Sequence, residues 1–192
     1  MGAKLFGSHL GFNLKLIDQH VGMGRVQLLR LPGCIEARQR HGLLLRRELE
    51  PLSHLVAFSL PTHATGVNPE TGYFAWDGSG CRSDCSWFGF LLRAQPDGPC
   101  SRAELAQRLE AGAIGTRMLF GGNLLRQPAF VQLRRDRPEA LRLASTMEGS
   151  DEIMTNTLFL GTYPGLTSDM LKAEIEVITS FAAKSFHAHR TA

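Results

Sequence analysis

The chain has few cysteines and no long apolar run, and each shortage excludes a class of protein. Four cysteines in 192 residues are too few for the disulfide framework of a small secreted domain, so we expect free thiols in a reducing, cytoplasmic setting. No stretch of about 18 apolar residues is present, so no membrane-spanning helix is predicted. No basic segment followed by a long apolar stretch opens the chain, so no secretory signal is predicted.

Several motifs that mark cofactor and nucleophile chemistry are also missing. The sequence has no Gly-x-Gly-x-x-Gly, no phosphate loop ending in Gly-Lys-Ser and no Gly-x-Ser-x-Gly turn. Cys81 and Cys85 are four residues apart, but no second close pair follows, and the nearest preceding histidine is His63. Ordinary free thiols are therefore favoured over a structural zinc site, and no metal site is predicted.

What is present has the composition of a globular domain. Hydrophobic residues make up 43% of the chain and charged residues 20%, and the length suits about one domain. The net charge is +3, with basic residues interleaved with acidic ones. Arg38, Arg40, Arg46 and Arg47 are interpreted as a solvated helix face, because no aromatic residues alternate with them for base stacking. No nucleic-acid partner is predicted.

Local patterns predict helices that bracket a few strands. A helix begins at Asp18, and Pro32-Gly33 marks either a kink or the start of a second helix. The Ser101-Arg-Ala-Glu104 capping box starts another helix, which ends near Gly112. The remaining expected elements are the second helix at 34–50, strands at 55–60, 87–92, 114–120 and 157–162, a long surface loop at 62–82, a short helix at 151–156 and a last helix from Thr167 or Ser168. The predicted fold class is α/β or α+β, a small three- to four-stranded sheet with helices packed on one face.

Two loops carry residues that suit anion binding. Residues 8–15, Ser-His-Leu-Gly-Phe-Asn-Leu-Lys, place a carboxamide and an ammonium just before a helix, which can hold a phosphate. The alternative is a loop whose Asn13 binds its own backbone. In the second loop, Arg117 lies in an otherwise apolar strand that leads into Gly121-Gly122-Asn123. Its charge needs either a carboxylate of the fold or an anionic ligand.

Five ordered segments resemble one known family. They are Ser-His-Leu-Gly-Phe-Asn-Leu-Lys at 8–15, Ser-Asp and Ser-Trp-Phe-Gly-Phe at 83–90, Gly-Thr-Arg-Met-Leu-Phe through Gln-Pro-Ala-Phe at 115–130, Asp-Glu-Ile-Met at 151–154, and Gly-Thr-Tyr-Pro-Gly-Leu-Thr at 161–167. The chain resembles the C-terminal part of the DegT/StrS-type sugar aminotransferases, which are fold-type I PLP enzymes. Within that family it is most similar to the CDP-4-keto-6-deoxyglucose 3-dehydrase group of lipopolysaccharide biosynthesis.

The resemblance implies a PLP or PMP cofactor shared with a large domain or a partner subunit, and a nucleotide-linked keto-deoxysugar as substrate. In the family, the asparagine matching Asn13 reaches across the dimer to the cofactor phosphate, and Lys15 stands where many members carry a basic residue. The segment matching residues 117–123 borders the substrate pocket, which makes Arg117 and Asn123 candidate substrate contacts. No residue of this chain is implied to be catalytic and no iron–sulfur cluster is expected, because those groups precede the matched segment in the family.

The match begins close to Met1, so we expect a truncated or split gene product that is inactive alone. Its expected parts are an N-terminal loop and inter-domain helix at 1–33, a small domain at 34–186 and a tail at 187–192. The expected partner is a second copy, a full-length homologue or the missing N-terminal half, whose cofactor and substrate pocket this chain completes. The alternative is a non-catalytic remnant that binds a sugar nucleotide or a homologue. Exposed apolar surface is expected where the large domain would dock.

Overall fold

The computed structural model describes residues 16–190 apart from residues 69, 72, 84 and 97, with side chains described as far as residue 182. Contacts divide the chain into two compact units, residues 1–34 and residues 35–192. Helix α1, Asp18–Leu49, runs through both units and contains Pro32, so the prediction of a separate second helix at 34–50 is wrong. A helix can pass a proline when it gives up one backbone hydrogen bond, and here it does so.

The first unit is the part of α1 that precedes Ile35, together with the residues before it. Its apolar side chains are exposed, among them Met23, Leu28 and Leu29. In a globular domain, apolar residues on a helix are normally buried against a second layer. The exposed apolar surface expected from the sequence is therefore present on this segment.

The second unit is built on a four-stranded antiparallel sheet with the strand order β1-β4-β6-β5. The strands are β1, Val56–Ala57; β4, Gly89–Ala94; β5, Thr116–Met118; and β6, Thr157–Gly161. The central strand β6 has four consecutive buried residues and pairs with β4 on one side and β5 on the other. The sheet size and class predicted from the sequence are confirmed, although β1 and β5 are shorter than the strands predicted at 55–60 and 114–120.

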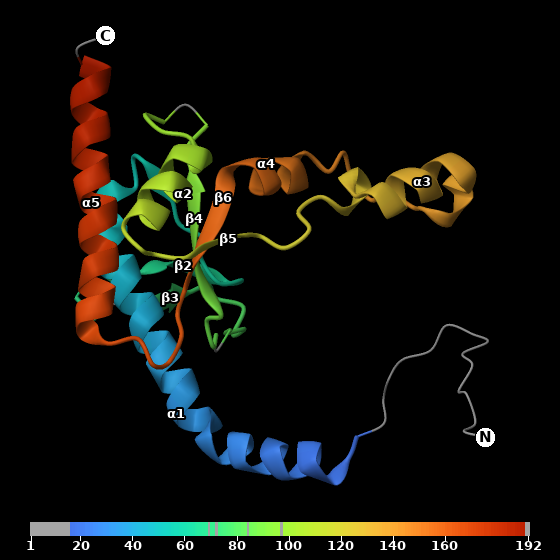
Figure 1. The fold of residues 1–192 in the computed structure, drawn as a ribbon, viewed down its shortest axis with the longest axis horizontal. Helices are drawn as coiled ribbons and strands as arrows, with labels where there is room; N and C mark the ends of the chain where they lie inside the picture. Colours follow the sequence, from blue (N-terminus) through green and yellow to red (C-terminus); the bar gives the residue numbers. More distant parts are fainter. Residues whose placement is uncertain (1–15, 69, 72, 84, 97, 191–192) are drawn as a thin grey trace, which may run out of the picture. The chain divides into compact units, whose positions relative to one another are not determined.

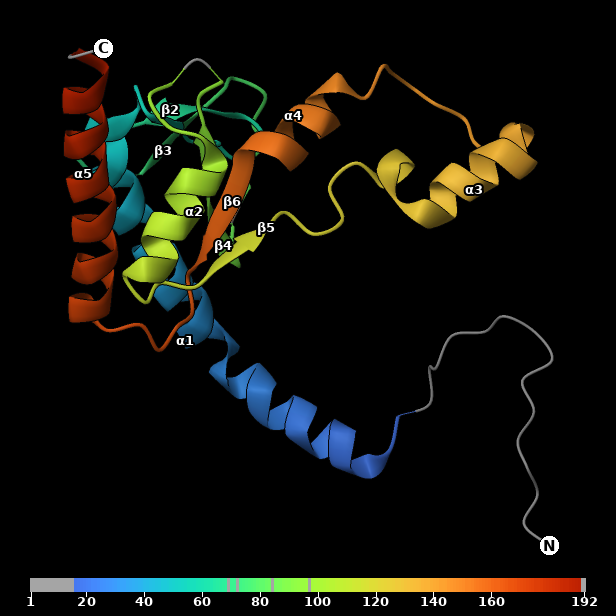
Figure 2. The same ribbon diagram turned by 45° about the horizontal axis from the view of Figure 1, so that its top comes forward.

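Helices cover one face of this sheet (Figures 1 and 2). They are α2, Arg102–Ala111; α5, Ser168–Arg190; and residues 35–49 of α1. Leu92 of β4 and Leu158 and Leu160 of β6 point into the core between the sheet and the helices. The predicted capping box starts α2, since Glu104 Oε2 accepts from the Ser101 backbone and the Ser101 side chain accepts from the Glu104 backbone.

Among the described residues, the helix on the opposite face of the sheet is the short α4, Glu148–Asn156, which leads directly into β6. Helix α3, Pro128–Asp136, was not predicted; it has no buried residues and packs with the short helical turns on either side of it. Beyond α4, this face is open, and we refer to it as the open face of the sheet.

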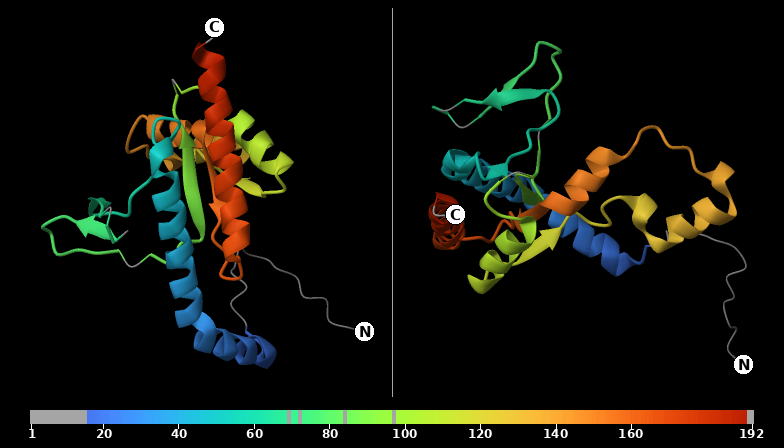
Figure 3. Two further views of the ribbon diagram at one scale, coloured as in Figure 1. Left: turned by 90° about the vertical axis from the view of Figure 1, so that its left-hand side faces the viewer. Right: turned by 90° about the horizontal axis from the view of Figure 1, so that it is seen from above.

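The segment predicted as a surface loop at 62–82 instead contains a second, two-stranded sheet. Its strands are β2, Ala64–Val67, and β3, Phe74–Trp76, which pair antiparallel with an irregularity between Ala64 and Gly66. Turn-forming residues dominate the segment, so its composition predicts a loop and does not indicate the two short strands, which are defined by their pairing with each other. We call this segment the β2–β3 hairpin; it stands beside the second part of α1 (Figure 3).

Among the residues that the structure describes, no helix is both long and apolar enough to cross a membrane.

Candidate functional site

The four residues predicted to contact cofactor or substrate fall in two places. Asn13 and Lys15 lie outside the described residues. Arg117 and Asn123 lie at β5 and at the end of the loop that follows it. The candidate site is therefore built from the open face of the sheet and this loop.

Arg117 stands on the open face, in one row across the sheet with Phe159 of β6 and Leu91 of β4. Its side chain is exposed, so its charge carries no burial cost. Of the two partners predicted for this charge, the structure supplies no carboxylate: no ion pair of Arg117 occurs among the described residues. The guanidinium faces solvent in a position where an anion can reach it.

Three phenylalanine rings line the sheet next to Arg117. The Phe88 and Phe120 ring centroids lie 6.0 Å and 6.2 Å from the centroid of Phe159. Phe159 is buried, whereas Phe88 and Phe120 are 63% and 80% exposed. These rings, with Leu91 and Leu119, form part of the wall of a cavity of about 230 Å³. The open face thus offers an apolar surface beside Arg117; Arg46 of α1 also lines the cavity, and Arg38 lies over the Phe88 ring, 5.7 Å from its centroid.

The loop after β5 is held close to α4. Gly122 has φ +62°, a conformation that favours glycine, and a Cβ there would lie 2.9 Å from Cβ of Met154. Phe120 also has a positive φ, +46°, which turns its ring out of the strand. Gly122 therefore lets the chain pass against α4, and Phe120 is presented on the open face.

Asn123 is buried, and its side chain is fully engaged within the fold. Its Nδ2 donates to Asp151 Oδ1 at 2.8 Å, and its Oδ1 accepts from the Leu125 backbone at 3.0 Å. Arg126 donates from Nε and Nη2 to the two oxygens of Asp151, each at 2.6 Å. These bonds from Arg126 and Asn123 lower the pKa of Asp151 to about 2. In this structure Asn123 positions the loop, and its contact with substrate stays a prediction.

A second ion pair ties α4 to the sheet. Arg93 of β4 donates from Nη1 to Glu152 Oε1 at 2.6 Å. Asp151 and Glu152 are adjacent, so α4 is held on one side by the loop and on the other by β4. Sequence reasoning missed both ion pairs, because their partners are 25 and 59 residues apart and no local pattern connects them.

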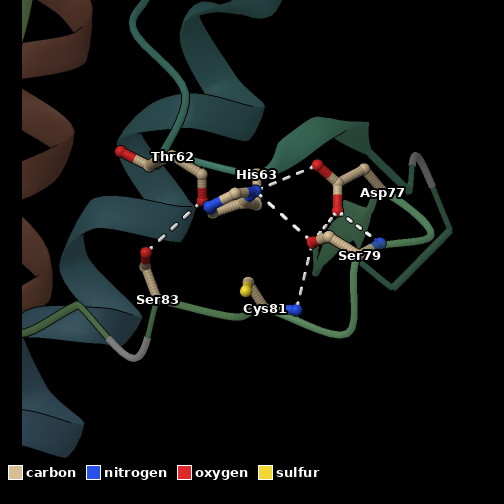
Figure 4. A network of polar contacts seen from close by, with 6 residues as sticks. All are labelled: Thr62, His63, Asp77, Ser79, Cys81 and Ser83. Atoms are coloured by element: carbon tan, nitrogen blue, oxygen red, sulfur yellow. Dashed lines mark hydrogen bonds and ion pairs between the residues drawn. The ribbon is translucent and has the colours of Figure 1, made fainter.

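A polar network at the base of the β2–β3 hairpin resembles a catalytic triad in composition only (Figure 4). His63 Nδ1 lies 3.0 Å from Asp77 Oδ2 and 3.4 Å from Ser79 Oγ, and the Ser79 hydroxyl also donates to Asp77. Hydrogen bonds from Ser79 and His63 lower the pKa of Asp77. Ser79 and Asp77 both contact Nδ1 of His63, so the imidazole cannot relay a proton between them. The network fastens the ends of the hairpin.

The described residues do not by themselves fit a metal or a PLP cofactor. No group of three His, Cys, Asp or Glu side chains in the described part of the chain is arranged to hold a metal. The lysine with a described side chain, Lys172, is exposed at the start of α5 and lies 3.8 Å from Asp169, so no amine faces the cavity on the open face. No reaction step is assigned to a cofactor on this surface.

Comparison with known proteins identifies the family. The sequence profile of the DegT/DnrJ/EryC1/StrS aminotransferase family matches residues 1–179. A dTDP-4-dehydro-2,6-dideoxy-D-glucose 3-dehydratase from Saccharopolyspora spinosa is 37% identical over 178 residues, which cover 93% of this chain and 33% of the relative. The lipopolysaccharide biosynthesis protein RfbH of Salmonella typhimurium is 31% identical over 179 residues, covering 93% of this chain and 36% of that protein.

A solved structure gives the same answer for the fold. The E. coli GDP-4-keto-6-deoxy-D-mannose-3-dehydratase with bound hydrated PLP superposes with a TM-score of 0.66 at 18% identity, over 87% of this chain and 36% of that chain. The chain spans about a third of the length of the curated relatives it matches. The family predicted from the five sequence segments is thus confirmed: the chain belongs to the DegT/DnrJ/EryC1/StrS aminotransferase family.

Proposed function

We propose that this chain forms the small-domain wall of the substrate pocket in a PLP- or PMP-dependent nucleotide-sugar 3-dehydratase or aminotransferase of deoxysugar and lipopolysaccharide biosynthesis. The proposal is supported by the family match over residues 1–179 and by two relatives above 30% identity that belong to deoxysugar or lipopolysaccharide biosynthesis by name. The observation that carries it is Arg117, an exposed cation beside an aromatic surface on the open face of the sheet.

Each part of the open face has a role in this proposal. Arg117 pairs with the diphosphate that links nucleotide and sugar, because a guanidinium offers paired donors to phosphate oxygens. Phe120 and Phe159 cover the apolar side of a deoxygenated sugar ring and keep water from it. Asp151 holds Asn123 and Arg126, and so fixes the loop that presents Phe120.

Cofactor chemistry in this proposal comes from a cofactor-binding domain, on this or another polypeptide, in a second copy or in a full-length homologue. Asn13 and Lys15 remain the proposed contacts to the cofactor phosphate. The exposed apolar side chains of α1 before Ile35, such as Leu28 and Leu29, are the proposed docking surface for that domain.

The test uses the chain purified together with its cofactor-binding domain and loaded with PMP. Dehydration of dTDP-, CDP- and GDP-linked 4-keto-6-deoxysugars is followed by product formation. We expect turnover of at least one of them, and a loss of about tenfold in kcat/KM for Arg117→Gln, since one charge-assisted contact to phosphate is removed. Arg134→Gln on the exposed helix α3 is the matched control and keeps full activity.

Two results would contradict the proposal. Turnover that is equal in Arg117→Gln and Arg134→Gln would remove Arg117 from the substrate pocket. Saturable binding of the nucleotide sugars without turnover in the reconstituted sample would favour the alternative, a non-catalytic domain that binds a sugar nucleotide.

A further inference from the structure

A second concave surface lies between α1 and the β2–β3 hairpin. The groove has a volume of about 680 Å³ and is lined from α1 by Arg40 and Arg47, and from the hairpin side by Tyr73, Trp76 and Trp87. The hairpin follows β1, one edge of the sheet, whereas Arg117 lies on β5, the other edge. The groove shares Phe74 and Trp87 with the cavity on the open face, whereas Arg40, Arg47, Tyr73 and Trp76 line the groove and not that cavity.

Contacts within the fold hold the aromatic wall in place. A Cβ at Gly42 would lie 2.8 Å from Trp87 Cδ1, so the indole packs directly on the backbone of α1. Arg38 Nη1 donates to the Trp87 backbone oxygen at 2.9 Å. The Phe74 ring lies 6.0 Å from both Trp76 and Trp87, and joins the two indoles into one wall. The network of His63 and Asp77 fastens the base of the same hairpin (Figure 4).

The opposite wall is cationic. Arg40 and Arg47 are seven residues apart, so they lie on one side of α1 two turns apart. Their side chains are 64% and 63% exposed, and each has an acidic neighbour: Arg40 lies 4.0 Å from Glu36, and Arg47 lies 2.7 Å from Glu48. Of these two acids only Glu36 lines the groove, which leaves the lining with a net positive charge. Exposed ion pairs of this kind are weak and yield readily to a stronger anion.

We infer that this groove binds a nucleoside diphosphate, with the base against Trp76 and Tyr73 and the phosphates at Arg40 and Arg47. Indole and phenol rings provide stacking surfaces that accept any base, and guanidinium groups pair with phosphate oxygens through two donors at once. A volume of about 680 Å³ is within the range of small-molecule sites and holds one nucleotide rather than a strand. The inference goes beyond the proposed function, because it adds a nucleotide site away from Arg117.

The sequence makes the test direct, because its two tryptophans, Trp76 and Trp87, both line the groove. The full chain is excited at 295 nm and titrated with GDP, dTDP, guanosine and inorganic phosphate. We expect saturable quenching by the nucleoside diphosphates with a Kd below about 1 mM, and weaker binding of guanosine or phosphate alone. A titration of free N-acetyltryptophanamide corrects for light absorbed by the nucleotide.

Variants assign the two halves of the ligand. The double variant Arg40→Gln/Arg47→Gln is expected to weaken diphosphate binding at least about tenfold and to leave guanosine binding unchanged. Trp76→Leu weakens both, with Trp87 as the remaining reporter. Arg134→Gln on the exposed helix α3 serves as the control and does not change the Kd.

The inference is overturned if no nucleoside diphosphate gives saturable quenching, or if the double variant binds as Arg134→Gln does. It is also overturned if inorganic phosphate binds as tightly as GDP, which would leave the aromatic wall without a role, or if a single-stranded oligonucleotide binds more tightly than any diphosphate. None of these measurements depends on a cofactor or a partner, so they fail or succeed independently of the proposed function.

Discussion

Glu174 gives the sharpest prediction about stability, because it is a carboxyl group on the core side of α5. The residue is 8% exposed, and its Oε2 has no hydrogen-bond partner among the described residues. Burial raises the pKa of Glu174 from 4.5 to about 7. The folded chain therefore holds a proton that the unfolded chain releases between these two values.

The magnitude follows from linkage between protonation and folding. Each pH unit between the folded and unfolded pKa is worth about 1.4 kcal/mol, so ionised Glu174 destabilises the folded chain by about 3 kcal/mol. Because the folded pKa is the higher one, this loss is absent below pH 4.5, grows as the pH rises and is complete above about pH 7. A domain of this kind is stable by about 5–15 kcal/mol, so the effect is measurable.

The assay compares wild type with Glu174→Gln by urea unfolding at pH 4.5, 6, 7 and 8. Glutamine keeps the shape of the side chain and cannot ionise. We expect equal free energies of unfolding at the lowest pH, and an advantage of about 3 kcal/mol for the variant at pH 8. Glu176→Gln, an exposed glutamate on the same helix, is the control and shows no such trend. A difference between wild type and Glu174→Gln that does not change with pH would refute the reasoning.

Two further predictions concern the loop after β5. Asp151→Asn weakens the hydrogen bonds from Arg126 and Asn123, so limited proteolysis near Arg126 should become faster. In wild type these bonds persist as the pH falls through 3.8 and are lost only near pH 2, because the pKa of Asp151 is lower in the folded chain than in the unfolded chain. A wild-type loop that opens near pH 4 would contradict this. Gly122→Ala should lower the free energy of unfolding by about 1–2 kcal/mol through its positive φ and the contact with Met154, whereas Gly121→Ala, where a Cβ would meet the side chain of Leu124 at 3.6 Å, should cost less than half as much in the same urea titration.

Several elements could be read from the sequence because neighbouring residues determine them. The capping box at Ser101 starts α2 through bonds between residues three apart, and Gly112 follows its end. Three consecutive apolar residues, Leu158 to Leu160, mark β6 as a strand. The family resemblance needed no more than five ordered segments, since such segments preserve residue types whatever the packing.

Other features were decided only by the tertiary structure. Proline ends many helices, yet α1 continues through Pro32. Residues 62–82 have the composition of a loop, yet β2 and β3 pair within them. The sequence singles out Arg117 and Asn123 equally. The sheet register leaves Arg117 exposed, whereas Asn123 is buried and bonded to Asp151, which lies 28 residues further along the chain.

The physical reason is the range of the interactions. Local propensity and capping act over three or four residues and leave their mark in the sequence. Whether a side chain faces solvent, an ion-pair partner or an aromatic wall depends on segments far apart in the chain that meet only when the sheet closes. The groove beside the hairpin and the buried carboxyl of Glu174 belong to this second kind.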